Sequence, residues 1–188
     1  RAVSAATPKV ADYPLTTLYP NLGVVSVEPH RSFVIADVPG LIEGAADGAG
    51  LGTQFLRHLQ RTRLLLHLVD ISPMEGGVEG VSPVEQVRAI ERELERHDPE
   101  LLAKPRWLVL NKADLMFEDE ARAAAEAIVA ELGWEAPWFL VSAIGREGTW
   151  PIMLAVQAFF DRLREEQAEA GQGSGSAPAG EGYGHADA

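Results

Sequence analysis

The sequence predicts an α/β fold whose sheet is mostly parallel and carries helices on both faces. Apolar, strand-like runs alternate with segments of helical periodicity, and three of these runs end in short polar signals. The signals are Asp37-Val38-Pro39-Gly40, Asn111-Lys112-Ala113-Asp114 and Ser142-Ala143. Because the ligands of open α/β sheets gather at the carboxyl ends of the strands, these signals predict a ligand site along one edge of the sheet.

The first half of the chain is expected to form a hairpin and one parallel strand. Residues 22–27 and 33–37 have strand composition, and their closeness in the sequence favours antiparallel pairing. The other expected elements are the end of a helix over 1–6, loops over 12–21 and 43–52, a helix around 55–59, and a buried strand over 64–69 that leads into Asp70.

The second half alternates helices and strands, and its helix ends carry local signals. Ser82 suits an N-cap and Pro83 suits the first helical position, while Gly133 suits a helix end. The expected elements are a helix from Pro83 with apolar positions 84, 87, 90 and 94, a strand over 107–110, a helix over 120–132 capped by Asp119, a strand over 138–141, and a helix from Thr149 to about Arg164.

Composition limits the classes of protein to which this chain can belong. The chain has 188 residues, 46% of them hydrophobic, and a formal net charge of −12. One domain over residues 1–165 and a disordered, glycine-rich tail over 166–188 account for this length. The negative charge argues against nonspecific binding to nucleic acid or anionic membranes, so any RNA contact must be local.

Cysteine and methionine usage adds further expectations. The sequence has no cysteine, which excludes disulfides and thiolate metal sites, and no apolar run is long enough to span a bilayer. A reducing cytoplasm is therefore the expected location. The chain begins at Arg1 and its first methionine is Met74, which favours a fragment without its native amino terminus.

The second and third signals suit recognition of a guanine base. Guanine presents two adjacent donors, a ring N–H and an exocyclic amine, and the Asp114 carboxylate can accept from both. Adenine would turn a lone pair toward that carboxylate, which costs roughly 10⁴-fold in comparable polar pockets. Lys112 can lay its methylene stem along the base, and Asn111 can tie neighbouring loops together. The Ala143 N–H can donate to the guanine carbonyl, with Ser142 holding that turn. The alternative is an ordinary polar turn after a strand.

The first signal and the loop before it suit a phosphate and a metal ion. Asp37 can hold Mg²⁺ through a water, and the Gly40 N–H can approach a terminal phosphate because no side chain obstructs it. Thr16 and Thr17 offer further ligands in an upstream loop. A strand-ending Pro-Gly turn and a β-branched linker are the alternatives. No segment matches Gly-x4-Gly-Lys-Ser/Thr, the phosphate-cradling loop that such a site requires.

Three further features carry less weight. Residues 44–52 are glycine-rich but lack lysine, which favours a loop over a second phosphate cradle. His67 lies inside an apolar strand and is expected to be a core histidine. A basic patch is more typical of a solvated helix face than of an RNA contact; it consists of Arg57, His58, Arg61 and Arg63.

Two longer segments resemble one family closely, the Obg GTPases. The segment ADYPLTTLYPNLG over residues 11–23 is similar to the family's switch I, and DVPGLIEGA over 37–45 is similar to its switch II. GLGTQFLRH over 50–58 continues the match, and the resemblance extends over about residues 1–163. It implies an Obg-type G domain of the P-loop NTPase class that lacks its first strand and its P-loop.

The resemblance also implies an activity and partners. The intact protein would be a monomeric enzyme that hydrolyses GTP slowly with Mg²⁺, binds the large ribosomal subunit or its precursor with possible ribosomal RNA contact, and acts in subunit assembly and stress or growth control. Thr17 would bind Mg²⁺ directly and Asp37 through a water. Leu41 stands where many GTPases carry a water-orienting glutamine, so turnover should be low. The residues expected to contact GTP or GDP are Leu15, Thr16, Thr17, Leu18, Tyr19, Asp37, Val38, Pro39, Gly40, Asn111, Lys112, Ala113, Asp114, Ser142, Ala143 and Ile144.

Two departures from the family pattern leave other interpretations open. The sequence contains neither the phosphate loop nor the glycine-rich domain that the family places upstream, so feeble nucleotide affinity and no hydrolysis are expected for these residues alone. A noncatalytic ribosome-binding or regulatory module is one alternative. An unrelated α/β enzyme, whose turns match by chance, is another.

Overall fold

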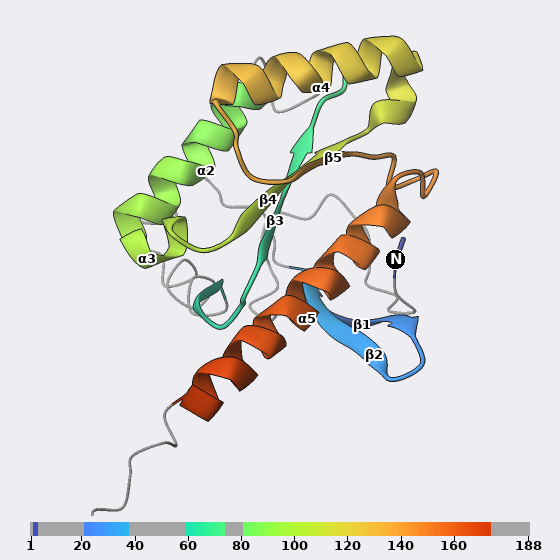
Figure 1. Cartoon of the computed structure of the whole chain (residues 1–188). Coiled ribbons are helices and arrows are strands. Elements are labelled where there is room, and N and C mark those ends of the chain that lie inside the picture. The colour runs from blue at the N-terminus through green and yellow to red at the C-terminus, as the bar shows by residue number, and fades with distance from the viewer. Residues whose placement is uncertain (1, 4–20, 38–58, 74–80, 174–188) are drawn as a thin grey trace, which may run out of the picture.

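The structure is a computed structural model, and it describes residues 2–3, 21–37, 59–73 and 81–173. Figure 1 shows how the elements are arranged. In chain order they are β1 (Asn21–Glu28), β2 (Arg31–Asp37), β3 (Leu65–Asp70), α2 (Pro83–His97), α3 (Pro99–Leu102), β4 (Arg106–Asn111), the 3₁₀ helix η2 (Ala113–Leu115), α4 (Glu118–Leu132), β5 (Trp138–Leu140) and α5 (Thr149–Gly173).

The described strands form two sheets. β1 and β2 pair antiparallel as the expected hairpin, with Val24 opposite Val34. β3, β4 and β5 form a parallel sheet with β4 in the centre. Among these strands no ladder joins β2 to β3, and Leu68 on β3 stays 61% exposed. Within the described residues, the hairpin and the parallel sheet therefore meet through side chains, without a shared main-chain ladder.

Two apolar clusters cover the two faces of the parallel sheet. On one face, α2 and α4 pack on β3 and β4, and Val87, Leu108 and Ala125 are fully buried there. On the other face, α5 packs against both the sheet and the hairpin, and Val25, Val109 and Val156 share its core. Figure 1 shows this arrangement, with α5 and the hairpin on the side of the sheet opposite α2 and α4. The helices thus lie on both faces, as the sequence predicts.

Aromatic rings connect the hairpin to the sheet through α5. The Phe33 ring of β2 lies 5.9 Å from the Phe160 ring, centroid to centroid, and Phe160 lies 5.5 Å from Phe159. Phe159 meets the Trp107 ring of β4 edge-on at 5.7 Å. Such tilted and edge-to-face pairs add about 0.5–1.5 kcal/mol each beyond the area they bury. An ion pair between Arg31 of β2 and Asp161 of α5 also joins the hairpin to this helix.

The start of α2 confirms the cap that the sequence predicts. The Ser82 hydroxyl accepts from the Glu85 N–H at 3.2 Å, and the Glu85 carboxylate accepts from the Ser82 N–H at 2.9 Å. Pro83 occupies the first helical position, where its missing N–H costs nothing. This capping box satisfies two donors that a helix start otherwise leaves unpaired.

The predicted start of α4 is wrong by two residues, because Asp119 lies inside the helix and Phe117 is the N-cap. The Phe117 carbonyl accepts from the Ala121 N–H at 2.9 Å, and the Glu120 carboxylate accepts from the Phe117 N–H. Backbone bonding and a glutamate three residues on therefore set this start. The predicted end at Gly133 is confirmed, since Gly133 has φ 61°.

The last helix is longer than expected, and a short helix was not expected at all. α5 begins at Thr149 but continues to Gly173, past Arg164, so residues 166–173 are helical rather than part of a disordered tail. Residues 165–170 are glutamate, glutamine and alanine, which favour a helix even when exposed. α3 follows Asp98, whose carboxylate accepts from the Glu100 N–H at 3.0 Å. Four residues are too few to give a periodic pattern.

Some expectations lie outside the described residues, namely most of the helix end over 1–6, the loops over 12–20 and 43–52, the helix residues 55–58 and the tail beyond 173. In the part of the chain that the structure describes, none of the helices is long and apolar enough to cross a membrane.

Candidate functional site at the carboxyl edge of the parallel sheet

Three polar strand ends meet at one edge of the parallel sheet. The register places Asp70, at the end of β3, beside Asn111, at the end of β4. β5 runs next to β4 with Leu110 opposite Leu140, and the Val141 N–H donates to the Leu110 carbonyl at 2.8 Å. Ser142 follows immediately. The second and third polar signals are therefore neighbours in space, as their place after parallel strands predicts.

Two hydrogen bonds tie the second signal to the third. The Asn111 side-chain oxygen accepts from the Ala143 N–H at 3.0 Å, and the Ala113 N–H donates to the Val141 carbonyl at 3.1 Å. Asn111 thus links the two loops. The Ala143 N–H, expected to donate to a guanine carbonyl, is already engaged by Asn111 in this structure. Ile144, the next residue, is 86% exposed, and its N–H has no partner among the described residues.

Lys112 is held in an unusual backbone conformation and by an ion pair. Its φ of 72° lies in the left-handed region, which side chains other than glycine and asparagine rarely occupy. Its ammonium pairs with the Asp70 carboxylate, and the other Asp70 oxygen accepts from the Ser72 N–H at 2.9 Å. Burial raises the pKa of Asp70, but Lys112 and the Ser72 donors outweigh it, so the pKa lies below its ordinary value. Asp70 is therefore a carboxylate that fixes the Lys112 head group.

Asp114 lies in η2, directly after Lys112. The Leu115 N–H donates to the Lys112 carbonyl at 3.1 Å and the Met116 N–H to the Ala113 carbonyl at 3.2 Å, which closes this tight turn. The Asp114 side chain is exposed, and it has no hydrogen-bond or ion-pair partner in the described part of the chain. A carboxylate with both oxygens free is able to accept two parallel hydrogen bonds from a ligand.

The turn after Ser142 is built around a buried hydroxyl. Ser142 is 1% exposed, and its hydroxyl accepts from the Gly145 N–H at 3.0 Å while its own N–H donates to the Glu147 carbonyl. Gly148 has φ 68°, and a Cβ there would lie 2.5 Å from the Leu140 carbonyl oxygen. Only glycine suits this position. The turn therefore fixes Ala143 and Ile144 at the edge of the sheet.

The first signal is only partly described. Asp37 is the last residue of β2, exposed, and it belongs to the hairpin sheet. Val38, Pro39, Gly40 and residues 15–19 lie outside the described residues. Within the described ranges, no group of three or more histidine, aspartate or glutamate side chains could hold a metal ion. The Mg²⁺ ligands Thr17 and Asp37 stay predictions.

Asp70 is the site residue that sequence analysis missed. The sequence shows a polar residue, Asp70, at the end of an apolar strand-like run, just as Asn111 and Ser142 follow the other two runs. Its role depends on the β3–β4 register, which brings it beside the loop of Lys112. A single sequence does not give that register.

Comparison with known proteins places this fold in a class of protein. Residues 1–112 match the family described as 50S ribosome-binding GTPase. The chain belongs to this family. The α/β fold with a parallel sheet, expected from the sequence as a G domain of the P-loop NTPase class, is confirmed.

Solved structures with the same fold include two of the GTPase Era. Era bound to MgGDPNP and nucleotides 1506–1542 of 16S ribosomal RNA superposes with a TM-score of 0.57 at 19% identity, over 83% of this chain and 48% of that chain. Aquifex aeolicus Era bound to GDP and AlF4⁻ gives 0.54 at 16%, over 83% and 48%. Translation elongation factor SelB from Methanococcus maripaludis, with GPPNHP, gives 0.52 at 13%, over 77% and 28%. The chain spans about half the length of the Era chains.

Proposed function

We propose that this chain is the guanine-binding part of an Obg-type GTPase, which hydrolyses GTP slowly and acts in assembly of the large ribosomal subunit and in growth control. Family membership, the polar edge of the sheet and the two switch-like segments support the proposal. The Era neighbour that carries a 16S ribosomal RNA fragment supports contact with ribosomal RNA. The large subunit as partner rests on the Obg resemblance and on the description of the family.

The observation that carries the proposal is the joined pair of loops after β4 and β5. The bond between Asn111 and Ala143 fixes the distance between the loops, and the ion pair with Asp70 fixes Lys112. Between these anchored residues Asp114 keeps a free carboxylate. A purine with a ring N–H next to an exocyclic amine, as in guanine, would satisfy this carboxylate with two donors. In adenine the amine lies next to an unprotonated ring nitrogen, so adenine cannot do so.

The hydrogen bond between Asn111 and Ala143 bears on which group we propose as the donor to the guanine carbonyl. Because the Ala143 N–H is engaged by Asn111, we infer that the Ile144 N–H donates to the carbonyl of the base. The exposed Ile144 side chain, flanking the same turn, gives an apolar surface at the rim of the base site. Ile144 therefore stays in the proposed site, where its backbone N–H is the group that contacts the base.

The phosphate end of the proposed site depends on residues outside the described ranges. Mg²⁺, when bound, would neutralise charge on the phosphates, and Thr17 and Asp37 are its proposed ligands. Leu41 cannot orient a water, since its side chain has no polar atom. Slow hydrolysis is therefore part of the proposal.

The test is a change of base preference that does not require tight binding. Protein-observed NMR at millimolar nucleotide should show GDP shifting the resonances of residues 111–114 and 142–144 in the wild-type chain, with ADP giving much smaller shifts. Asp114→Asn should weaken GDP and favour XDP, because xanthine offers a carbonyl where guanine has its amine. Asp119→Asn, an exposed acid on α4, is the matched control. Equal responses to GDP and ADP, or an unchanged preference in Asp114→Asn, would refute guanine recognition.

The second candidate is a noncatalytic ribosome-binding or regulatory module. No segment of the chain matches Gly-x4-Gly-Lys-Ser/Thr. GTP turnover should be measured for the intact protein, alone and with ribosomal particles, because these residues alone are expected not to hydrolyse GTP. Absence of turnover in both cases, together with guanine-selective binding and binding to the particles, supports the module over the enzyme.

A further inference from the structure

One face of α2 carries a row of arginines. Arg88, Arg92 and Arg96 follow one another at intervals of four residues, and all three are exposed. Four residues of helix rise about 6 Å and turn slightly more than once, so the three guanidinium groups lie along one side of the helix. In a chain with a net charge of −12, this row has the opposite sign to the average surface.

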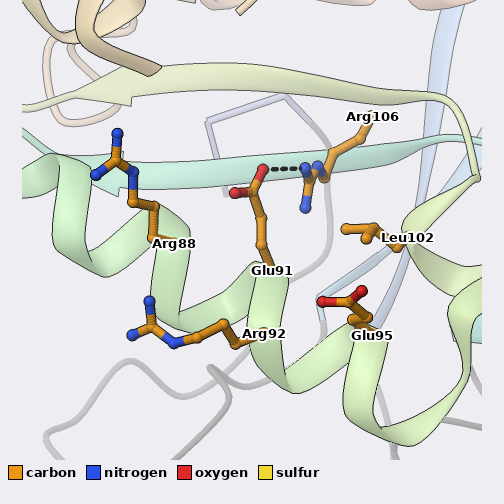
Figure 2. Close-up of a pocket in the computed structure, with 6 residues that line it drawn as sticks. All are labelled: Arg88, Glu91, Arg92, Glu95, Leu102 and Arg106. Carbon is orange, nitrogen blue, oxygen red and sulfur yellow. Dashed lines mark hydrogen bonds and ion pairs between the residues drawn. The ribbon is translucent and has the colours of Figure 1, made fainter. Parts of the chain in front are cut away.

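A hollow of about 510 Å³ lies beside this row and adds a fourth arginine. Figure 2 shows it between α2, the end of α3 and the start of β4. Its lining residues are Arg88, Glu91, Arg92, Glu95, Leu102 and Arg106. Both carboxylates belong to α2, and Glu91 is paired with Arg106.

Arg106 is held rigidly under the hollow. Its guanidinium carbon lies 5.0 Å from the centre of the Trp134 ring, and its Nη2 donates to Glu91. Its Nε and Nη1 are buried and have no hydrogen-bond partner within the described residues. One carboxylate therefore leaves part of this buried cation without a hydrogen-bond partner.

Arg88 and Arg92 are available for a ligand. Arg88 donates once, through Nη2, to the Glu131 carbonyl at 3.3 Å, which leaves most of its five N–H groups unused. Arg92 has no hydrogen-bond or ion-pair partner among the residues that the structure describes. In Figure 2 both side chains extend away from Glu91 rather than toward it. Neither guanidinium is neutralised by the nearby carboxylates.

The arginine surface lies at the edge of the sheet opposite the candidate base site. Arg106 begins β4 and Asn111 ends it, so about 17 Å of strand separates the two edges. A ligand on this surface would leave the base site open, and both could be occupied at once.

We propose that the surface formed by Arg88, Arg92 and Arg96, beside the largely buried Arg106, binds the phosphate backbone of RNA. The proposal rests on the proposed ribosome-associated function. Guanidinium groups pair bidentately with phosphates, and a row of them along one side of a helix can contact several phosphates of a nucleic-acid strand. Because the rest of the surface is negatively charged on average and repels phosphates, the contact with RNA is limited to this face.

The test compares two double variants of equal charge in the full chain. Binding to a fluorescein-labelled RNA hairpin is measured by anisotropy, without nucleotide, at several salt concentrations. Arg88→Gln/Arg92→Gln should weaken binding by about tenfold or more and lower the slope of log K against log salt by about 1.5. Arg122→Gln/Arg162→Gln removes exposed arginines from α4 and α5 and should change binding by less than about twofold. Circular dichroism and urea midpoints confirm that all variants fold.

Equal losses in the two double variants would overturn the proposal, because they would reduce the effect to net charge. No measurable RNA binding by the wild-type chain would also overturn it. Equal or tighter binding to vesicles with anionic lipids, lost in Arg88→Gln/Arg92→Gln, would assign the surface to a membrane instead.

The GDP and ADP titrations are run on the same variants. Normal guanine selectivity without RNA binding would refute this inference alone, whereas arginine-dependent RNA binding without guanine selectivity would refute the proposed function alone.

Discussion

His67 occupies the middle of β3, and its Nδ1 is buried without a hydrogen-bond partner in the described part of the chain. Burial and, to a smaller extent, the positive charge of Arg106 together lower the pKa of this histidine to about 4. The ring is therefore neutral in the folded protein at pH 7, which agrees with the core histidine expected from the sequence. Unfolding releases it into water, where a histidine has a pKa of about 6.5.

The two pKa values set the size and the pH range of the effect. As pH falls below about 6.5, the unfolded chain takes up a proton that the folded chain does not accept until about pH 4. The free energy of unfolding should therefore fall with pH across this window. Linkage gives about 2 kcal/mol lost between pH 7 and pH 5, and roughly 3 kcal/mol by pH 4.

His67→Leu removes the titrating ring and keeps an apolar side chain in the strand. Urea unfolding at pH 7, 6 and 5 should show that the variant loses about 2 kcal/mol less than the wild type over this range. His30→Asn is the control, since His30 is an exposed turn residue with φ 64°, which asparagine tolerates. Parallel pH profiles for the wild type and His67→Leu would refute the reasoning.

Three further predictions follow from local contacts. Ser82→Ala should lower the free energy of unfolding by about 1 kcal/mol in urea titrations, because it removes the cap of α2; an unchanged midpoint would contradict the capping box. Gly148→Ala should destabilise the fold by more than Gly133→Ala in the same assay, since both positions have positive φ but only at Gly148 would the new Cβ meet a carbonyl oxygen. Asp70→Asn should weaken GDP binding in the NMR titration by up to about fivefold while leaving the urea midpoint nearly unchanged; identical GDP affinity would show that Asp70 does not position Lys112.

The fold could be predicted from sequence where the determinants are local. Ser82 and Pro83 fix the start of α2 within two residues, and Gly133 ends α4 through its own backbone conformation. The same reasoning failed at Asp119, because a phenylalanine capped the helix through its backbone and through Glu120. At the end of α5, the exposed glutamate, glutamine and alanine residues that suggested a tail are also strong helix formers, and they continue the helix.

The candidate site shows the same division. The expected neighbourhood of Asn111 and Ala143 follows from strand order, and the structure adds a hydrogen bond between residues 32 positions apart. The role of Asp70 and the engagement of the Ala143 N–H depend on register and on side-chain geometry, which one sequence does not encode in a readable pattern. The expected contacts of residues 15–19 and 38–40 stay predictions.

The joint between the hairpin and the parallel sheet has a mechanical consequence. Phe33, Phe159, Phe160 and Trp107 form a chain of rings across α5, and the Arg31–Asp161 pair is the polar fastening beside it. Because no main-chain ladder joins these two described sheets, a shift of the hairpin relative to the parallel sheet need not break a backbone hydrogen bond between them. Any such shift, including one that begins at Asp37, would be transmitted through these side chains to α5, which continues beyond them to Gly173.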